Sequence, residues 1–521
     1  MQRNAHDVVI VGGGLCGSWA AKTLAEAGVN VLVLEAGAPV PTDVLGPETR
    51  TREARKAAST RQRIQSQHPA YWSHDPTLFV DDIDHPYQSS GEQPFVWIRG
   101  RQVGGRGVTW GGVTPRFSDY EFRAASRDGF GDDWPVSHAD LSAFYSEVES
   151  FFGVCGKAEG LAQLPDGVFT SPPDLTDAER LFSETVVRMR PGRTVTHSRA
   201  VPEIAAAPGR GDAAWPRRTP QHQMLPDALR TGRVQIRTGA VVSKLLMDST
   251  GRRVTGVECV DSTNRSTFVV PSRAVALCAS TIESVRIMRN SCTAAHPRGV
   301  GNSFDQLGRY LLDHAVSMLV GYVPGDRGDR THRFGGPNGI LVPRFHNIDD
   351  ARAPFLRGYG IWGNLGRGVA SNGQPVWTLC AMLEVLPRAE NAIEIDPNKP
   401  DIHGLPTPLI RFSHSANERE MRQDAGRCLQ EMVDAVGWPV VHRVNMSPGT
   451  FVHELGGARM GTRPESSVVD PFNRCWDARN LFVLDGACFV TSGWQNPTLT
   501  MLALGGRACR RIAEDIKTGD L

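Results

Sequence analysis

The chain has 521 residues, more than one typical hydrophobic core holds, so we expect two domains. Its 57 Lys and Arg side chains balance 56 Asp and Glu side chains, which removes the electrostatic reason to expect nucleic acid or an anionic membrane as partner and favours a small neutral ligand. No apolar run approaches the ~20 residues that cross a bilayer, so we expect a soluble chain without membrane insertion.

The chain opens with a pattern of strand, glycine-rich turn, helix and strand. Residues 8–11, Val-Val-Ile-Val, are a continuous apolar run, typical of a strand buried on both faces of a parallel sheet. A glycine-rich turn at 12–17 is followed by a helical pattern that ends at Gly28. A second buried strand at 31–34 then leads into Glu35.

The glycine-rich turn is expected to bind a dinucleotide. Gly12 makes the turn, Gly14 lets backbone N–H groups approach a pyrophosphate, and Gly17 permits close packing of the helix, whose N-terminus adds partial positive charge. Glu35, 23 residues after Gly12, can accept hydrogen bonds from a ribose diol, and its carboxylate disfavours the 2′-phosphate of NADP. An ordinary βαβ crossover with a glycine-rich turn is the alternative interpretation, and the residues alone leave FAD and NAD open.

The next part of the chain is irregular. Residues 45–95 are polar and Arg-rich without a sustained period, which indicates a long excursion, and the glycine-dense stretch 99–112 indicates a loop that lines a ligand. Helical spacing at 141–152 follows a cap at Ser137 or Asp140.

Further strands and helices are expected toward the C-terminus. Residues 234–247 and 253–260 are interpreted as two strands of a small antiparallel element, and 274–278 as a buried strand that leads into a helix from about residue 282. The remaining expected elements are strands at 317–322, 376–385 and 391–396, and helices at 416–435 and from about residue 498.

The cysteines favour reduced thiols, and the histidines give no sign of a metal site. The ten cysteines are scattered without CxxC spacing and no secretory signal precedes residue 8, which predicts reduced thiols and a cytoplasmic chain. The histidines lack HExxH or i, i+4 pairing, so no metal site is expected. His314 and His442 are candidates for polar groups near a flavin, but we favour core or surface roles for both, and the sequence leaves a homo-oligomer open.

Motifs along the whole chain resemble the glucose-methanol-choline (GMC) oxidoreductase family. Within it, Thr114-Pro115-Arg116-Phe117 and Asp133-Trp134-Pro135-Val136 resemble the bacterial sugar and glycoside oxidases related to pyranose oxidase, including C-glycoside 3-oxidases. The segments that carry the family resemblance are Glu35-Ala36-Gly37, 103–105, 110–112, 277–284, 301–314, His453-Glu454-Leu455-Gly456-Gly457-Ala458-Arg459-Met460-Gly461, 467–470, 480–486 and Asn496-Pro497-Thr498-Leu499-Thr500.

The resemblance implies an α/β fold in which a Rossmann-like FAD-binding domain is interleaved with an α+β substrate-binding domain that carries an antiparallel sheet. The FAD-binding domain is expected to comprise 1–45, 95–120, 226–315 and 446–521. The segment 46–94 would be an excursion or lid, and 121–225 with 316–445 the substrate-binding domain.

The resemblance also implies FAD as the cofactor. Fungal pyranose oxidases attach the flavin covalently through a histidine in the glycine loop, and this chain has Thr109 there, which implies non-covalent FAD. The residues expected at the cofactor are Gly12, Gly14, Leu15, Cys16, Gly17, Glu35, Ala36, Arg101, Gly104, Gly105, Thr109, Trp110, Gly111, Gly112, Val241, Val242, Ala279, Asp485, Gly486, Asn496, Pro497 and Thr498.

The chemistry implied is oxidation of a secondary hydroxyl of a pyranose or glycoside, at C3 of a glucoside or C-glycoside, with hydride passing to the flavin and then electrons to oxygen. A neutral imidazole can take the hydroxyl proton, and His453 is the expected general base, with Asn496 bonded to the same substrate oxygen. A dehydrogenase that passes electrons to a quinone or haem partner, a non-redox lyase with structural FAD, and a non-enzymatic flavin-binding module are the alternatives.

Overall fold

The computed structural model describes residues 6–39, 78–202, 221–325, 339–349, 352–370 and 373–521. In chain order the described elements are β1 (Val8–Val11), α1 (Leu15–Glu26), β2 (Val31–Leu34), β3 (Gln88–Ser90), η4 (Gly105–Val108), α4 (Asp119–Phe122), α5 (Ala124–Asp128), α6 (His138–Phe152), α7 (Asp177–Met189), β4 (Thr196–His197), α8 (Gln221–Arg230), β5 (Val234–Arg237), β6 (Ala240–Met247), β7 (Val254–Asp261), β8 (Thr267–Pro271), β9 (Ala274–Leu277), α9 (Thr281–Asn290), β10 (His314–Tyr322), β11 (Ile340–Val342), β12 (Tyr359–Val369), β13 (Pro375–Glu384), β14 (Ala392–Pro400), β15 (Pro406–Arg411), α10 (Ala416–Val436), β16 (Val440–Val444), β17 (Leu481–Val483), η5 (Gly486–Cys488) and α11 (Thr498–Thr518).

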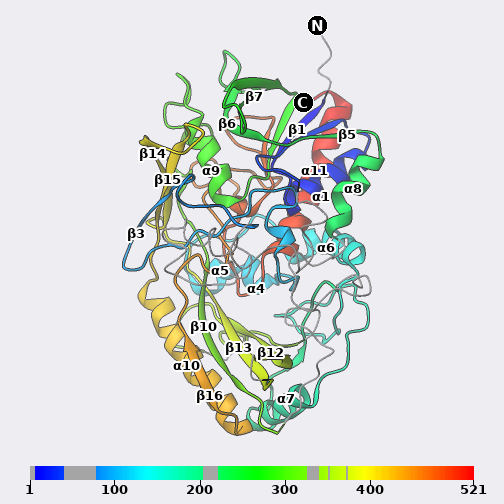
Figure 1. Ribbon diagram of the computed structural model, residues 1–521, viewed down its shortest axis with the longest axis vertical. Helices are drawn as coiled ribbons and strands as arrows, with labels where there is room; N and C mark the ends of the chain where they lie inside the picture. The colour runs from blue at the N-terminus through cyan, green and yellow to red at the C-terminus, as the bar shows by residue number, and fades with distance from the viewer. Residues whose placement is uncertain (1–5, 40–77, 203–220, 326–338, 350–351, 371–372) are drawn as a thin grey trace.

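A five-stranded parallel sheet forms the first layer, with strand order β17-β9-β1-β2-β5. Strand β1 is fully buried, as its apolar run predicts, and α1 packs between α8 and α11 beside the sheet. In Figure 1 this layer and its helices form the upper part of the molecule, where β1 and the C-terminal helix α11 lie. The order is that of a Rossmann-like nucleotide-binding unit, whose ligands bind at the carboxyl edge of the strands.

The predicted long strand at 234–247 is wrong. It is broken at Gly239, which has φ +68°, into two strands that belong to different sheets. Strand β5 extends the parallel sheet beside β2, and β6 starts a three-stranded antiparallel sheet in the order β6-β7-β8. A left-handed turn allows the chain to change sheets within two residues.

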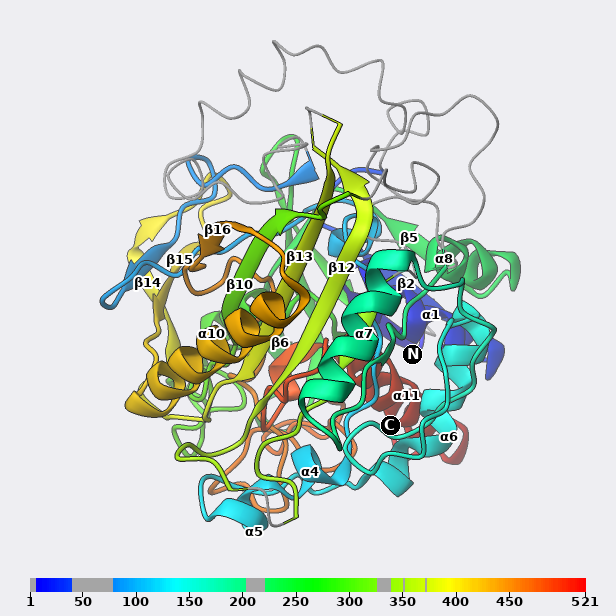
Figure 2. The same cartoon turned by 90° about the horizontal axis from the view of Figure 1, so that it is seen from below.

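A six-stranded sheet in the order β16-β10-β13-β12-β11-β4 forms the second layer, and its pairs are antiparallel. Helices α7 and α10 lie across one of its faces (Figure 2). Strand β12 was not predicted, because glycines interrupt its apolar pattern. At Gly360 the missing side chain has a packing reason, since a Cβ there would lie 2.1 Å from the Trp494 ring.

The two sheets are interleaved along the chain, because β4 precedes β5, and β17 follows β16. The expected excursion at 46–94 lies partly outside the described residues, since 40–77 are not described. Its described end contains β3, which pairs with β15 in a small third sheet of order β14-β15-β3.

Helix boundaries follow their caps. The predicted helix at 416–435 is confirmed as α10, which starts at the capping box of Ser415 and Glu418 and ends at Gly437 in the left-handed conformation. At α6 Ser137 is the N-cap and Asp140 completes the capping box, so both predicted candidates contribute. Among the described helices none is long and apolar enough to cross a membrane.

Candidate active site

Two glycine-rich loops form a cradle at the carboxyl edge of the parallel sheet. Gly12 has φ +101°, and a Cβ on it would lie 2.4 Å from the carbonyl oxygen of Cys278. A Cβ on Gly17 would lie 1.8 Å from the carbonyl oxygen of Gly12. Gly14 is the N-cap of α1 and carries no capping side chain, so the first N–H groups of the helix are left for a ligand.

The second loop lies directly on the first. The N–H of Gly104 donates to the carbonyl of Gly13 at 2.9 Å, and a Cβ on Gly105 would lie 3.1 Å from the Cα of Gly14. Gly107 packs against Leu15, the first residue of α1. The two stretches that the sequence identified separately therefore form one structure.

The second loop continues through the remaining predicted residues. The Thr109 hydroxyl donates to the carbonyl of Arg106 at 3.1 Å. The Trp110 indole N–H is buried and donates to no group in the described structure. Gly111 is exposed and Gly112 is buried with φ +73°.

Glu35 holds the turn after β2 in place. Its carboxylate accepts the N–H of Gly13 at 2.7 Å and the N–H of Gly37 at 2.8 Å. Burial raises the pKa of Glu35, while these N–H groups and the charge of Arg101 lower it. Ala36 packs against Val241, whereas Val242 lies in the main hydrophobic core.

Asp485 and α9 complete this edge of the sheet. The Asp485 carboxylate accepts the hydroxyl of Ser284 at 2.6 Å and the N–H of Ala487 at 3.0 Å, which caps η5 at Gly486. Burial raises the pKa of Asp485 to about 6 although these donors lower it. Burial, and then the nearby Asp485, raises the pKa of the Cys16 thiol well above its usual range.

Three further predicted residues are Ala279, at the same edge, and Pro497 and Thr498, at the start of α11. Ala279 follows β9, and its Cα lies 3.0 Å from the position of a Cβ on Gly12. Pro497 is the N-cap of α11 and Thr498 its first residue, with no capping side chain.

His453 lies at the centre of a hydrogen-bonded chain. Its Nδ1 is 2.8 Å from Nδ1 of His314, and the other nitrogen of His314, Nε2, is 2.9 Å from the carbonyl oxygen of Gly493. On its other side, Nε2 of His453 is 3.4 Å from Nδ2 of Asn496. The structure therefore brings the two predicted catalytic residues, His453 and Asn496, together.

The chain assigns the tautomers of both rings. The Gly493 carbonyl only accepts hydrogen bonds, so Nε2 of His314 carries the proton and its Nδ1 is an acceptor. His453 must then donate from Nδ1, which leaves the lone pair on its Nε2, beside the Asn496 amide. Neutral His453 therefore carries its acceptor lone pair on Nε2.

Burial keeps both rings neutral. It lowers the pKa of His314 to about 4. The pKa of His453 is held well below its usual range by burial and then by the neighbouring His314 and Arg106. Arg106 bonds the carbonyl of Val452 and the carboxylate of Glu454, on either side of His453, and so fixes the backbone that carries the ring.

Sequence reasoning considered His314 near the flavin but favoured a core or surface role for it. It is 2% exposed, as a core residue would be, but its hydrogen bond to His453 gives it a second role. The available signal was its place at the start of β10, on the same face as Val316 and Met318. His442, the other histidine considered, is exposed on the edge strand β16. It pairs with Val320, near the opposite end of β10 from His314.

The residues present fit an FAD molecule. The glycine cradle excludes side chains where a pyrophosphate would approach, and Glu35 lies at the ribose end of the motif. Next to His453, Oδ1 of Asn496 is buried without a hydrogen-bond partner, and so is the Trp110 indole N–H in the second glycine loop. Buried polar atoms without partners in the described structure are expected where a polar ligand binds.

Comparison with known proteins agrees with this geometry. Family models described as GMC oxidoreductase match residues 387–505 and 213–316, and a model of an NAD(P)-binding Rossmann-like domain matches 10–74. The chain is 26% identical to 2-methyl-1,2-propanediol dehydrogenase of Mycolicibacterium austroafricanum, over 96% of this chain and 94% of that protein. It is 25% identical to C-glycoside 3-oxidase of Microbacterium trichothecenolyticum, over 99% of this chain and 98% of that protein.

The fold is shared with a solved structure of pyridoxine 4-oxidase from Mesorbium loti. That structure superposes with a TM-score of 0.66 at 18% identity, covering 97% of this chain and 99% of the other.

Proposed function

The chain belongs to the GMC oxidoreductase family and is an FAD-dependent oxidoreductase acting on CH–OH groups, and from this we propose that it oxidises a secondary hydroxyl of a pyranose or glycoside, at C3 of a glucoside. The hydrogen-bonded chain of His314, His453 and Asn496 carries the proposal, because it supports a neutral base beside an amide donor. FAD, when bound, supplies the hydride acceptor.

In the proposed reaction Nε2 of His453 takes the substrate hydroxyl proton. The Asn496 amide donates to the same oxygen and holds it in place as charge develops. Because His314 is buried and neutral, its Nδ1 goes on accepting the Nδ1–H of His453 after the proton arrives. His314 is thus a positioning residue that keeps the basic lone pair on the substrate side.

The residues proposed to hold FAD are those of the cradle and the neighbouring turns. Gly12, Gly14 and Gly17 would admit the pyrophosphate to the N-terminus of α1, and Glu35 would accept from the ribose hydroxyls. Thr109 offers no ring nitrogen for attachment, so we propose that FAD is held non-covalently. Acid precipitation should then release all of the yellow chromophore into the supernatant.

Similarity to C-glycoside 3-oxidase supports oxygen as acceptor and a glycoside as substrate. Similarity to 2-methyl-1,2-propanediol dehydrogenase supports the second candidate, a dehydrogenase that uses another electron acceptor. Stoichiometric hydrogen peroxide under air would exclude the dehydrogenase, and activity only with artificial acceptors would exclude the oxidase.

The proposed substrate class is tested by anaerobic bleaching of the bound flavin with free sugars, O-glucosides, C-glucosides and simple diols. Fastest bleaching by a glucoside, with a 3-keto product, is the expected result. Bleaching by none of the sugars or glucosides would contradict the proposal, and bleaching by no alcohol at all would favour a lyase with structural FAD.

A further inference from the structure

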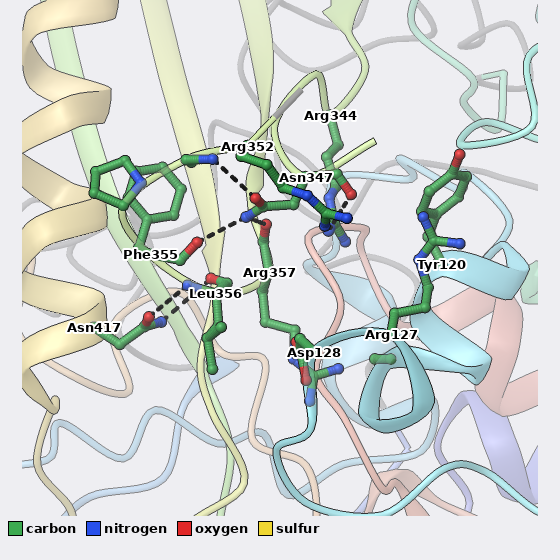
Figure 3. Close-up of a pocket in the computed structure, with 13 residues that line it drawn as sticks. Tyr120, Arg127, Asp128, Arg344, Asn347, Arg352, Phe355, Leu356, Arg357 and Asn417 are labelled. Atoms are coloured by element: carbon green, nitrogen blue, oxygen red, sulfur yellow. Dashed lines mark hydrogen bonds and ion pairs between the residues drawn. The ribbon is translucent and has the colours of Figure 1, made fainter. Parts of the chain in front are cut away.

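A cavity lies apart from the glycine cradle and His453. Its volume is about 480 Å³, and it opens between the short helices α4 and α5, the segment that joins β11 to β12, and the start of α10 (Figure 3). Four arginines and one aspartate line it: Arg127, Arg344, Arg352, Arg357 and Asp128.

Two of the four lining arginines have carboxylate neighbours, since Arg357 lies beside Asp128 and Glu384 and Arg344 lies beside Glu121, and the other two do not. Asp128 forms an ion pair with Arg357, whose Nε lies 2.9 Å from the carboxylate. Nη2 of Arg357 also donates to the Phe130 carbonyl. Arg127 and Arg352 are exposed, and neither has a carboxylate within ion-pair distance among the described residues. The nearby Asp349 accepts the hydroxyl of Tyr120, which lines the cavity.

Two of the arginines are held in place before any ligand arrives. The guanidinium of Arg127 lies 4.0 Å from the centroid of the Tyr120 ring. Arg344 donates from Nε to the His346 carbonyl at 2.9 Å, while its Nη1 is buried without a hydrogen-bond partner. Burial lowers the pKa of Arg344, so an anion nearby would stabilise its charged form.

The other walls are apolar apart from Tyr120 and two amides, Asn347 and Asn417, whose side chains are hydrogen-bonded to backbone groups of residues 353–357. Ala124, Pro354, Phe355 and Leu356 line the cavity beside the arginines. A ligand that fills it would therefore combine an anionic group with an apolar body.

The cavity is connected to the loop that carries Asn496. Nη1 of Arg344 lies 3.7 Å from Oε1 of Glu121, and Oε2 of Glu121 accepts from Nε2 of Gln495 at 2.9 Å. Gln495 directly precedes Asn496, and Glu121 and Gln495 are both fully buried. An anion that competes with Glu121 for Arg344 would change the charge felt by this loop.

We propose that this cavity binds an organic oxyanion, a carboxylate or phosphate ester with an apolar body, and that its occupancy alters substrate turnover through Arg344, Glu121 and Gln495. The inference concerns residues outside the oxidation site and does not depend on which alcohol is oxidised.

The test uses the FAD-loaded enzyme with benzoate and inorganic phosphate as probes. Their dissociation constants are measured by calorimetry at constant ionic strength, with chloride as the reference anion. The double variant Arg127→Ala/Arg352→Ala should weaken binding at least about 10-fold, because each exposed guanidinium would supply a charge-assisted hydrogen bond. Arg180→Ala, which removes an exposed arginine on α7, should leave it unchanged.

The two probes distinguish the sources of the oxyanion. Preference for benzoate supports a carboxylate with an apolar body, and preference for phosphate supports a phosphate ester. Binding no stronger than that of chloride, or binding equally strong in the double variant, would overturn the site. The bound probe should also change the apparent KM or kcat of the wild type but not of the double variant, and binding without such a change would overturn the coupling.

Discussion

Replacing His314 tests whether the neighbouring ring sets the tautomer of the base. In His314→Gln the amide can still reach toward Gly493, but no acceptor remains at the position of Nδ1. His453 then loses the partner of its Nδ1–H, and the tautomer that is basic at Nε2 loses its advantage. In His314→Asn the amide oxygen stands at the δ position and can accept the same N–H.

The size of the effect follows from the lost hydrogen bond. Leaving a buried donor unsatisfied costs about 1–3 kcal/mol. If that cost falls on the reactive tautomer, the rate of substrate oxidation drops about 5- to 150-fold, since each 1.36 kcal/mol is a factor of ten. The 2.8 Å separation between the two Nδ1 atoms indicates a well-formed bond, so we expect the drop to exceed tenfold.

The assay is anaerobic stopped-flow bleaching of the flavin by substrate, with FAD content and substrate affinity measured for each variant. We expect a slow His314→Gln, a His314→Asn closer to the wild type, and normal FAD content in both. Equal rates in the wild type and His314→Gln, or equal losses in both variants, would refute the tautomer argument.

Three further predictions concern the cofactor, the base and the stability. Gly14→Ala should fold normally, because the added Cβ would only touch Gly105 at 3.9 Å. It should bind FAD at least about 10-fold more weakly in a titration, because the methyl group stands where the pyrophosphate would approach. Unchanged affinity would show that the pyrophosphate does not lie against Gly14. Since the pKa of His453 lies well below 6.5, the bleaching rate should stay level from pH 8 down to about pH 6, where an ordinary histidine would already be protonated; a limb near 6.5 would contradict this. Burial raises the pKa of Asp313 to about 7, so its ionisation destabilises the fold as pH rises through about 4 to 7. The free energy of unfolding of Asp313→Asn, measured with denaturant, should therefore exceed that of the wild type by up to about 4 kcal/mol at pH 8.5 and by much less at pH 4. A difference that does not change with pH would refute the role of Asp313 ionisation.

The elements that could be predicted from sequence are those whose pattern depends on local burial. Strands β1, β2 and β9 are continuous apolar runs because both of their faces are covered. Strand β5, Val-Gln-Ile-Arg, lies at the sheet edge and shows an alternation that suits an antiparallel strand equally well, so it was placed in the wrong sheet.

Other elements depended on distant contacts. Gly360 of β12 makes room for Trp494, more than a hundred residues away, and Gly363 makes room for Ile340 and Leu379, so the glycines that interrupt the strand's apolar pattern serve distant contacts. Helix α7 was missed in a Pro- and Arg-rich region although Thr176 and Glu179 form its capping box. That box was a readable signal.

The candidate site divides in the same way. The glycine motif and Glu35 could be predicted because one βαβ unit contains them. The pairing of His453 with Asn496 rested on resemblance to a family, since residues 43 positions apart on loops leave no periodic trace. His314 is 139 residues from His453 and begins β10 of the six-stranded sheet, whereas His453 lies on a loop, so only the folded structure brings their rings together.

The proposed reaction requires His453 to take the proton while FAD accepts the hydride. The most direct test is the anaerobic reduction rate of His453→Ala loaded with FAD. We predict a yellow protein with normal FAD content whose flavin is bleached by substrate at least ~100-fold more slowly than in the wild type. Reduction at the wild-type rate would contradict the account.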